Sequence, residues 1–283
     1  MLNVMCDIST GYGLSIDFQA SSVASEWHDA IVLLAMVAGG MTLLGLVTNY
    51  LLVRNMKPTE DLQSDKDEAK VEVVRYRRPA RILHWICAAA FTILFVTGIS
   101  RFVSGQGQVI SDGWLYVLHL AAGIVFVTAP VIYLLTNCRA CLKGMKHTLI
   151  WGKEDLDWMK AAPHYYFLCD ERAMPPQGYL NTLQKVWLLL VIVFGLILAT
   201  SGIIMWAFES VASVEFLELM LFAHDIAFIA IGTMFMVHIY ISVLHPMSGS
   251  TKTGAWSAIT RGKVSAEYAK SHHGKWYQEV AKS

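Results

Sequence analysis

Two histidines lie within one long apolar run, LMLFAHDIAFIAIGTMFMVHIY, at residues 219–240. Ionisable side chains are costly in the hydrocarbon core of a membrane, so the ones found there usually serve a function. On an α-helix, His224 and His238 would be separated by about 21 Å along the axis and would face nearly the same side. Imidazoles from two helices that face each other can bind haem iron from both sides. The run is therefore a candidate contributor to two haem sites at different depths.

The composition indicates that membrane-spanning helices position these histidines. Of the 283 residues, 55% are hydrophobic and 16% are charged, and the net charge is zero, which gives no reason to expect nucleic-acid binding. The apolar residues fall in blocks of about 20, the length that crosses a bilayer as an α-helix. Residues 1–28 contain no Lys or Arg, so no cleaved signal peptide is expected before the first block. The predicted spans are residues 30–53, 82–102, 114–135, 186–208 and 216–244.

The positive charges predict how these spans are oriented. Of the 22 Lys and Arg residues, only Arg101 lies outside the loop between the first two spans, the segment between the third and fourth, and the C-terminal tail. Loops rich in Lys and Arg remain in the cytoplasm. The N-terminus is therefore predicted to lie outside and the C-terminus in the cytoplasm.

This orientation sorts four histidines into two pairs. His84 begins its span at the cytoplasmic level, which is also the level of His238. His119 begins its span at the outer level, which it shares with His224. The pattern predicts an all-α membrane protein in which a four-helix bundle carries two b haems, with one extra N-terminal helix. A single membrane histidine is more often a hydrogen-bonded packing residue, and a pair could instead bind another metal such as copper.

Other residues near these levels have two possible roles. Three glycines could let a flat macrocycle approach the backbone, or could serve ordinary helix packing: Gly98, Gly123 and Gly232. Arg81 and Arg101 could pair with haem propionates or anchor the helices at the interfaces. Asp225 is expected to meet water at the outer end of its span, with haem tuning or a partner contact as alternatives. Cys138 and Cys141 form a lone C-x-x-C, expected to be free thiols.

Several segments resemble the cytochrome b (gamma) subunit of membrane-bound formate dehydrogenases. They are RPARILHW, LYVLHLAAG, LMLFAHDIAF, VHIY and the tail GKVSAEYAKSHHGKWYQEV. The resemblance covers about residues 75–283 and places the chain in the wider prokaryotic di-haem cytochrome b group. Residues 1–74, a helix and a linker, form a separate predicted segment. The family implies an inner haem held by His84 and His238 and an outer haem held by His119 and His224, the pairing that the charges also predict.

The resemblance further implies that menaquinone or ubiquinone is reduced beside the inner haem. Asn181 and Gln184, where the fourth span enters the membrane, match polar positions of the family's quinone pocket. Leu183 stands where the family has a glycine, which puts the shape of that pocket in doubt. Capping of the helix start by Asn181 is the structural alternative.

The family also implies partner subunits in a bacterial or archaeal cytoplasmic (inner) membrane. An iron–sulfur subunit at the outer side would deliver electrons from a molybdenum or tungsten catalytic subunit. These groups would belong to partner chains, because this chain has no pterin motif and no cluster-type set of cysteines. Electrons would then pass through the outer and inner haems to quinone. The alternatives are the same bundle in a respiratory hydrogenase or a thiosulfate or polysulfide reductase, and a non-haem membrane anchor.

Overall fold

A computed structural model describes residues 22–56, 71–104, 113–170, 174–245 and 254–282. Within these ranges five helices are long and apolar enough to cross a membrane, which confirms the five predicted spans. They cover Asp29–Val53, Arg78–Ser100, Gly113–Thr136, Thr182–Ala207 and Val214–Leu244. The fourth span begins four residues before the predicted start because Asn181 and Gln184, which are polar, cap the helix there.

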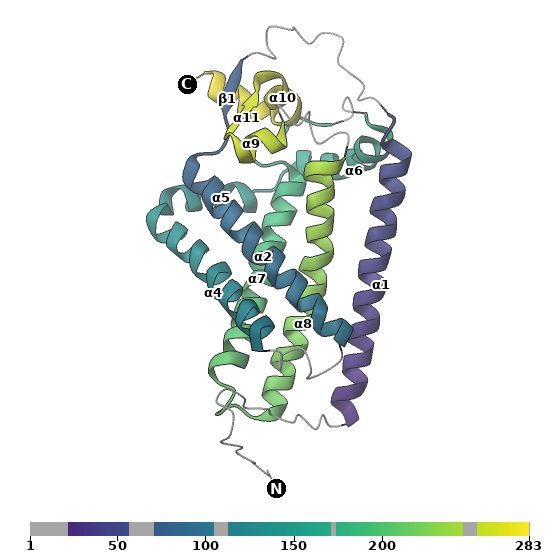
Figure 1. The fold of residues 1–283 in the computed structure, drawn as a ribbon. Coiled ribbons are helices and arrows are strands. Elements are labelled where there is room, and N and C mark those ends of the chain that lie inside the picture. The colour runs from purple at the N-terminus through teal and green to yellow at the C-terminus, as the bar shows by residue number, and fades with distance from the viewer. Residues whose placement is uncertain (1–21, 57–70, 105–112, 171–173, 246–253, 283) are drawn as a thin grey trace.

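The five long helices run side by side (Figure 1). They are α1 (Ser22–Val53), α2 (Arg78–Ser104), α4 (Gly113–Thr136), α7 (Thr182–Ala207) and α8 (Val214–Ile239). Helix α2 packs against α4, and α8 packs against α7, α1 and α2. Helix α8 is the most buried of the five spans and continues into a short π-helix, η2 (Tyr240–Leu244). The helix with one histidine at each predicted level is therefore the helix that the rest of the protein covers most.

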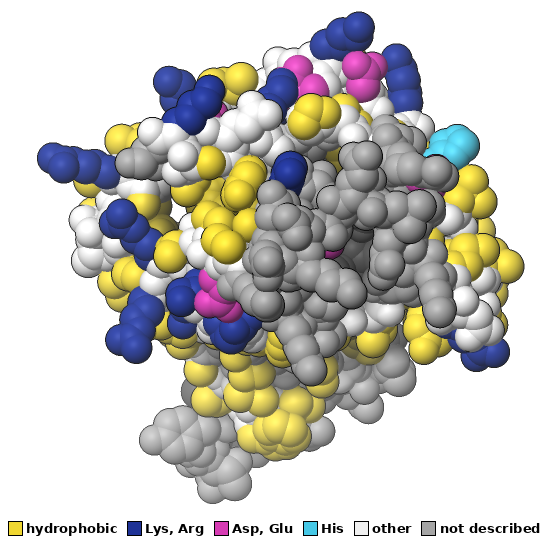
Figure 2. Space-filling model, turned by 90° about the horizontal axis from the view of Figure 1, so that it is seen from above, with side chains coloured by type: hydrophobic (Ala, Val, Ile, Leu, Met, Phe, Trp, Pro, Cys, Tyr) yellow, Lys and Arg dark blue, Asp and Glu magenta, His cyan; other side chains and the backbone are white. Residues whose placement is uncertain are grey.

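Short elements gather at the end of the molecule that contains the C-terminus (Figure 1). Two of them, α5 (Cys138–Leu149) and α6 (Lys153–Leu168), join α4 to α7. The remaining ones are β1 (Glu72–Val74), α9 (Ala255–Thr260), β2 (Lys263–Ser265), α10 (Ala266–His272) and α11 (Gly274–Ala281). We call these five elements the tail cap. Figure 2 shows this end from above, with Lys and Arg side chains spread around it.

Strand β1 ties the chain that precedes α2 to the tail. It pairs antiparallel with β2, with Val73 opposite Val264. The Glu72 carboxylate accepts from Arg261 at 2.8 Å and from Lys263 at 3.1 Å. Gly262 has a φ of 85°, and an added Cβ there would lie 2.5 Å from the backbone oxygen of Tyr76, so this turn requires glycine. Residues 72–74, which end the predicted N-terminal segment, therefore fold together with the tail.

A buried arginine lies in the centre of the tail cap. The Arg75 guanidinium lies 4.4 Å from the ring centroids of both Tyr179 and Trp276 and donates to the Tyr179 carbonyl. His273 is also buried, and its Nδ1 lies 2.9 Å from the Gly178 carbonyl. These contacts join the tail to the segment that leads into α7.

The side chain of Asn49 bonds helix α1 to two other elements, α6 and η2. The buried Asn49 amide donates to the Tyr166 carbonyl at 3.1 Å and accepts from the Tyr240 hydroxyl. His245 Nε2 lies 2.9 Å from the same Tyr166 carbonyl. Amides inside a membrane protein are stabilised by such bonds between helices. The additional helix predicted from the sequence thus packs as part of this protein's own bundle.

A buried ion pair fixes the start of α7. Asp155 of α6 is 1% exposed and accepts from Lys185 at 2.8 and 2.9 Å and from the Thr182 hydroxyl at 2.9 Å. Burial alone would raise the pKa of Asp155, but the hydrogen bonds from Lys185, Gly152 and Thr182 outweigh it and hold the pKa below its ordinary value. The carboxylate therefore stays charged and holds α6 against the first turn of α7.

Candidate functional site

The structure places the four bundle histidines in two pairs. His84 of α2 faces His238 of α8, with ring centroids 6.4 Å apart and ring planes at 55°. His119 of α4 faces His224 of α8, also at 6.4 Å, with ring planes at 54°. The two pairs therefore have almost the same geometry at two levels of α8.

The distance within each pair fits two imidazoles on opposite sides of one metal ion. A metal–imidazole bond is about 2.0 Å and a ring nitrogen lies about 1.2 Å from its centroid, so two such ligands hold their centroids about 6.4 Å apart. Rings joined directly by an N–H···N bond of about 2.9 Å would be only about 5.3 Å apart. Among the described residues, no three His, Cys, Asp or Glu side chains group around a possible metal ion. The distance within each pair therefore fits the ligation of one haem iron by two histidines.

Hydroxyl groups hold both histidines of the outer pair. Thr97 Oγ1 lies 2.7 Å from His119 Nδ1, and Ser201 Oγ lies 2.9 Å from His224 Nδ1. Each hydroxyl also donates to the carbonyl four residues earlier in its own helix, at 2.8 and 2.6 Å respectively. Because a hydroxyl has one hydrogen, each must accept the Nδ1–H of its histidine. This tautomer puts the lone pair of each ring on Nε2, the atom that would bind a metal.

Sequence reasoning missed Thr97 and Ser201, although the chain carries a signal for them. Each is followed by glycine and isoleucine, in the tripeptides TGI and SGI, on two different helices at the outer level. The glycine after Ser201 lies against the ligand candidate, because an added Cβ on Gly202 would be 3.5 Å from His224 Cε1. A hydroxyl and an adjacent glycine thus provide both a hydrogen bond and space beside His224.

Aromatic rings surround the inner pair. Trp187 of α7 stacks on His238, with ring centroids 4.7 Å apart and an interplanar angle of 2°. His84 meets the neighbouring Trp85 edge-on at 5.3 Å. The buried His84 Nδ1 has no hydrogen-bond partner among the described residues, and the same holds for Arg81 Nε. The unpartnered Arg81 Nε beside the inner pair fits a bound group that carries hydrogen-bond acceptors, as a haem with propionates does.

The two arginines proposed as propionate partners differ in what the structure describes. Arg81 Nη1 donates to the Arg261 carbonyl of the tail at 2.5 Å, so its guanidinium is fixed near the inner level. The side chain of Arg101 lies outside the described residues. The structure therefore supports a position for Arg81 alone.

Phenylalanine side chains lie beside two of the three predicted glycines. An added Cβ on Gly98 would lie 3.0 Å from the Phe228 ring, and one on Gly232 would lie 2.9 Å from the Phe95 ring. These rings belong to a cluster between the two histidine levels that contains Phe91, Phe95, Phe126, Phe228 and Phe235. The side chain nearest to Gly123 is Leu94, at 3.9 Å. In this structure Gly98 and Gly232 give space to phenylalanines, and their contact with a macrocycle stays a prediction.

The two residues proposed to bind quinone cap helix α7. Asn181 Oδ1 accepts from the Gln184 backbone at 2.9 Å, and Gln184 Oε1 accepts from the Asn181 backbone at 3.1 Å. Helix capping, the structural alternative to quinone binding, is thus present, but it uses only the amide oxygens of the two side chains. Neither amide nitrogen bonds another described residue, so both can donate to a carbonyl. Trp187, which stacks on His238, follows Asn181 by about 9 Å along the helix axis.

Asp225 differs from the expectation that it meets water. Its side chain is only 5% exposed, so it lies inside the protein. The short apolar segment around it could not reveal this, because burial depends on which neighbouring helix covers that face of α8. Cys138 and Cys141 are free thiols, as expected, with Cys138 exposed.

The fold and the paired histidines define an all-α, multi-pass membrane protein of the cytochrome b type. The chain belongs to the prokaryotic cytochrome b561 family, whose profile matches residues 75–260. Membership of this family implies b-type haem.

Relatives with a known role cover most of this chain. The formate dehydrogenase cytochrome b556(fdo) subunit of Escherichia coli K12 is 28% identical over 217 residues, which cover 75% of this chain and 94% of that protein. The formate dehydrogenase cytochrome b556 subunit of Haemophilus influenzae is 26% identical over 73% of this chain and 83% of its own length. The nitrate-inducible cytochrome b556(Fdn) subunit of E. coli K12 is 25% identical over 75% and 93%. All three names describe a cytochrome b subunit of formate dehydrogenase.

Proposed function

We propose that this chain is the di-haem cytochrome b subunit of a formate dehydrogenase-type complex and passes electrons to membrane quinone. The names of the relatives support the type of complex. The observation that carries the proposal is the presence of two histidine pairs, each with centroids 6.4 Å apart, that share helix α8. Two pairs of equal geometry support two haems in each chain.

The ligand roles follow from these pairs. His84 and His238 would hold the inner haem, and His119 and His224 the outer haem. The Thr97 and Ser201 hydroxyls would keep the outer ligands in the metal-binding tautomer. When bound, the two haems supply one-electron transfer along the bundle. Residues 75–283 would form the unit that holds both haems.

The quinone site is proposed at the start of α7, beside the inner pair. The amide nitrogens of Asn181 and Gln184 can donate to a quinone carbonyl while their oxygens cap the helix. Trp187 lies between this position and His238. Menaquinone and ubiquinone both offer the carbonyl that these amides would bind.

The outer pair is proposed to receive electrons from partner subunits. The end with the tail cap carries many Lys and Arg residues (Figure 2), which supports a cytoplasmic position for it. His119 and His224 would then lie near the outer face, where an iron–sulfur subunit would pass on electrons from a molybdenum or tungsten catalytic subunit. Formate oxidation would occur in that catalytic subunit.

Haem content of the purified chain tests this proposal. The expected result is two b haems per chain in the reduced-minus-oxidised spectrum, with His119→Ala and His84→Ala each keeping one. His164→Ala, at an exposed histidine of α6, is the matched control and should keep both. A chain that binds no haem, or a His119→Ala variant that keeps two, would contradict the ligand assignment. Copurified subunits would separate a formate dehydrogenase from a hydrogenase or a sulfur-compound reductase.

A further inference from the structure

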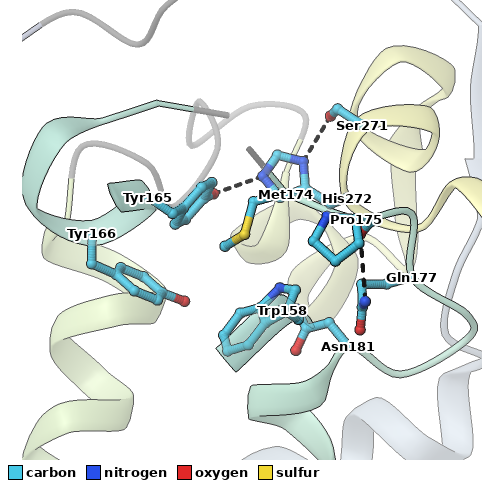
Figure 3. Close-up of a pocket in the computed structure, with 9 residues that line it drawn as sticks. All are labelled: Trp158, Tyr165, Tyr166, Met174, Pro175, Gln177, Asn181, Ser271 and His272. Carbon is cyan, nitrogen blue, oxygen red and sulfur yellow. Dashed lines mark hydrogen bonds between the residues drawn. The ribbon is translucent and has the colours of Figure 1, made fainter. Parts of the chain in front are cut away.

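A pocket lies where the tail cap meets the segment before α7. It is lined by residues of α6, of the 174–181 segment and of α10: Trp158, Tyr165, Tyr166, Met174, Pro175, Gln177, Asn181, Ser271 and His272. Its empty volume is about 380 Å³ including its open mouth, and its enclosed part has room only for water. Figure 3 shows Tyr165 and His272 on one side of this space and Asn181 with Trp158 on the other.

A chain of hydrogen bonds leads from the surface into this pocket. The exposed Ser271 places its hydroxyl 2.8 Å from His272 Nδ1. On the other side of the imidazole, His272 Nε2 lies 2.8 Å from the hydroxyl of Tyr165, which is 5% exposed. Both bonds are drawn in Figure 3. Each ring nitrogen thus has a hydroxyl partner, one toward solvent and one toward the interior.

The surroundings of His272 keep its ring neutral and in place. The ring stacks on Tyr268, with centroids 4.2 Å apart and planes at 18°, and lies edge-on to Tyr165 at 6.0 Å. Burial lowers the pKa of His272 to about 4, against an upward effect of the Tyr268 backbone. A neutral imidazole with two hydroxyl partners can take a proton at one nitrogen and release one from the other. Such a ring conducts protons near neutral pH without storing charge.

The pocket reaches the proposed quinone site through Asn181. This residue lines the pocket and also caps α7, the helix on which Trp187 contacts His238. Reduction of a quinone to a quinol consumes two electrons and two protons. If the acceptor is bound at Asn181, the protons have to reach it across the protein end that contains this pocket.

We propose that Ser271, His272 and Tyr165 form a proton relay from the solvent at the tail cap to the quinone site at Asn181. The relay rests on the proposed function, because it supplies the protons of quinone reduction. In each transfer Ser271 takes a proton from solvent water as its own O–H proton passes to His272 Nδ1, and the proton on His272 Nε2 passes to the Tyr165 oxygen. Tyr165 O–H then gives its proton to pocket water and the acceptor. The imidazole and the phenol both end neutral, and the return to the original tautomer resets them.

Oxidation of the reduced haems by quinone, followed in the purified complex by stopped flow, tests the relay. His272→Ala and Tyr165→Phe are each expected to slow haem oxidation by a short-chain quinone about 10-fold or more. Haem content and the rate of haem reduction by the electron donor should stay at wild-type values. Added imidazole should restore the rate of His272→Ala, because the free base can occupy the space of the lost ring, but it should leave Tyr165→Phe slow. Tyr268→Phe, which keeps the stacked ring, is the matched control and should behave as wild type.

The outcomes separate the relay from the proposed function. If wild-type haems are reduced by the donor but never oxidised by quinone, the proposed function itself fails. If wild-type haems react with quinone and His272→Ala reacts equally fast, the relay is wrong. A slow His272→Ala that imidazole does not restore also overturns it, because a loss of structure alone would give that result.

Discussion

Thr97 and Ser201 give the outer histidine pair a feature that the inner pair lacks among the described residues. Both outer imidazoles have a hydroxyl on Nδ1, whereas His84 Nδ1 has no such partner and His238 stacks on an indole. A hydrogen bond from Nδ1–H increases the electron donation of an imidazole to the metal that it binds. Stronger donation stabilises oxidised iron and lowers its reduction potential. Under the proposed function, the outer haem is therefore expected to have the lower reduction potential, which would favour electron transfer to the inner haem.

Removal of the Thr97 hydroxyl tests this difference. Thr97→Val keeps the shape of the side chain but leaves the His119 Nδ1–H without its acceptor. We expect the outer haem to be bound roughly 10-fold more weakly and its midpoint potential to rise, as measured by haem dissociation and by redox titration. Thr92→Val is the matched control, because Thr92 donates only to the Ala88 carbonyl of its own helix. An unchanged outer potential in Thr97→Val would show that the hydroxyl does not act on the ligand.

At the residue scale, spacing and charge predict which histidines share a level, but not what holds them. Helical periodicity brings His224 and His238 to one side of α8, and the distribution of Lys and Arg gives the direction of each span. Serine and threonine in membrane helices commonly bond their own backbone, as Thr97 and Ser201 also do. Their second contact depends on the neighbouring helix, which local sequence does not specify. Asn181 and Gln184 were predicted near the inner level, and the structure adds that they cap α7.

At the scale of elements, the tail cap depends on two histidines, His272 and His273, that its packing keeps in the neutral form. Burial and the adjacent Arg75 hold the pKa of His273 well below the ordinary value of 6.5, and burial lowers that of His272 to about 4. Both rings hydrogen-bond groups of distant segments, Gly178 and Tyr165. Protonation would place positive charge beside Arg75 in the centre of the cap.

The docking of the tail cap should therefore weaken in mild acid. The histidines of an undocked tail bind protons near pH 6.5, whereas docked His272 binds one only near pH 4 and the pKa of docked His273 also lies well below 6.5. The stabilisation is complete above about pH 6.5 and is lost progressively as the pH falls toward 4, with His272 contributing about 3 kcal/mol at most. Limited proteolysis of α10 and α11 at a series of pH values measures this loss.

An exposed carboxylate provides the control for that measurement. The Lys263 hydrogen bond lowers the pKa of Glu72 below its ordinary value of 4.5, so Glu72 titrates in a lower range of pH. Glu72→Gln should leave the transition between pH 6.5 and 4 in place. A tail that is equally protected at pH 7 and pH 5 would contradict the role of His272 and His273.

The elements differ in how far the sequence determines them. Long apolar runs predict the five spans because a bilayer requires a fixed helix length. Strands β1 and β2 have only three residues each and pair Val73 with Val264, so neither has a local pattern that would identify it. The linker that ends in β1 was expected to lie outside the core pattern, and its last residues pair with the tail. The pocket beside Tyr165 and His272 likewise forms only when α6 and α10 meet.

At the scale of the whole molecule, the distribution of basic residues predicts an orientation. The tail cap is expected in the cytoplasm and the loop between α7 and α8 outside. In a chain without its native cysteines, Ala281→Cys and Ser210→Cys introduce thiols at exposed positions at the two ends. A membrane-impermeant maleimide should label Ser210→Cys in spheroplasts and Ala281→Cys only in inverted vesicles. The reverse pattern would place the proposed quinone site at the outer face.

Helix α8 contributes one histidine to each pair, which limits how the distance between the two histidine pairs can vary. One residue inserted between His224 and His238 would rotate one imidazole by about 100° relative to the other and move it by only about 1.5 Å. A small insertion would thus turn a ligand away from its partner with almost no change in spacing. Seven added residues, close to two full turns, would restore both directions and lengthen the interval by about 10 Å. The distance between the two histidine pairs can therefore change only in steps of about whole helical turns.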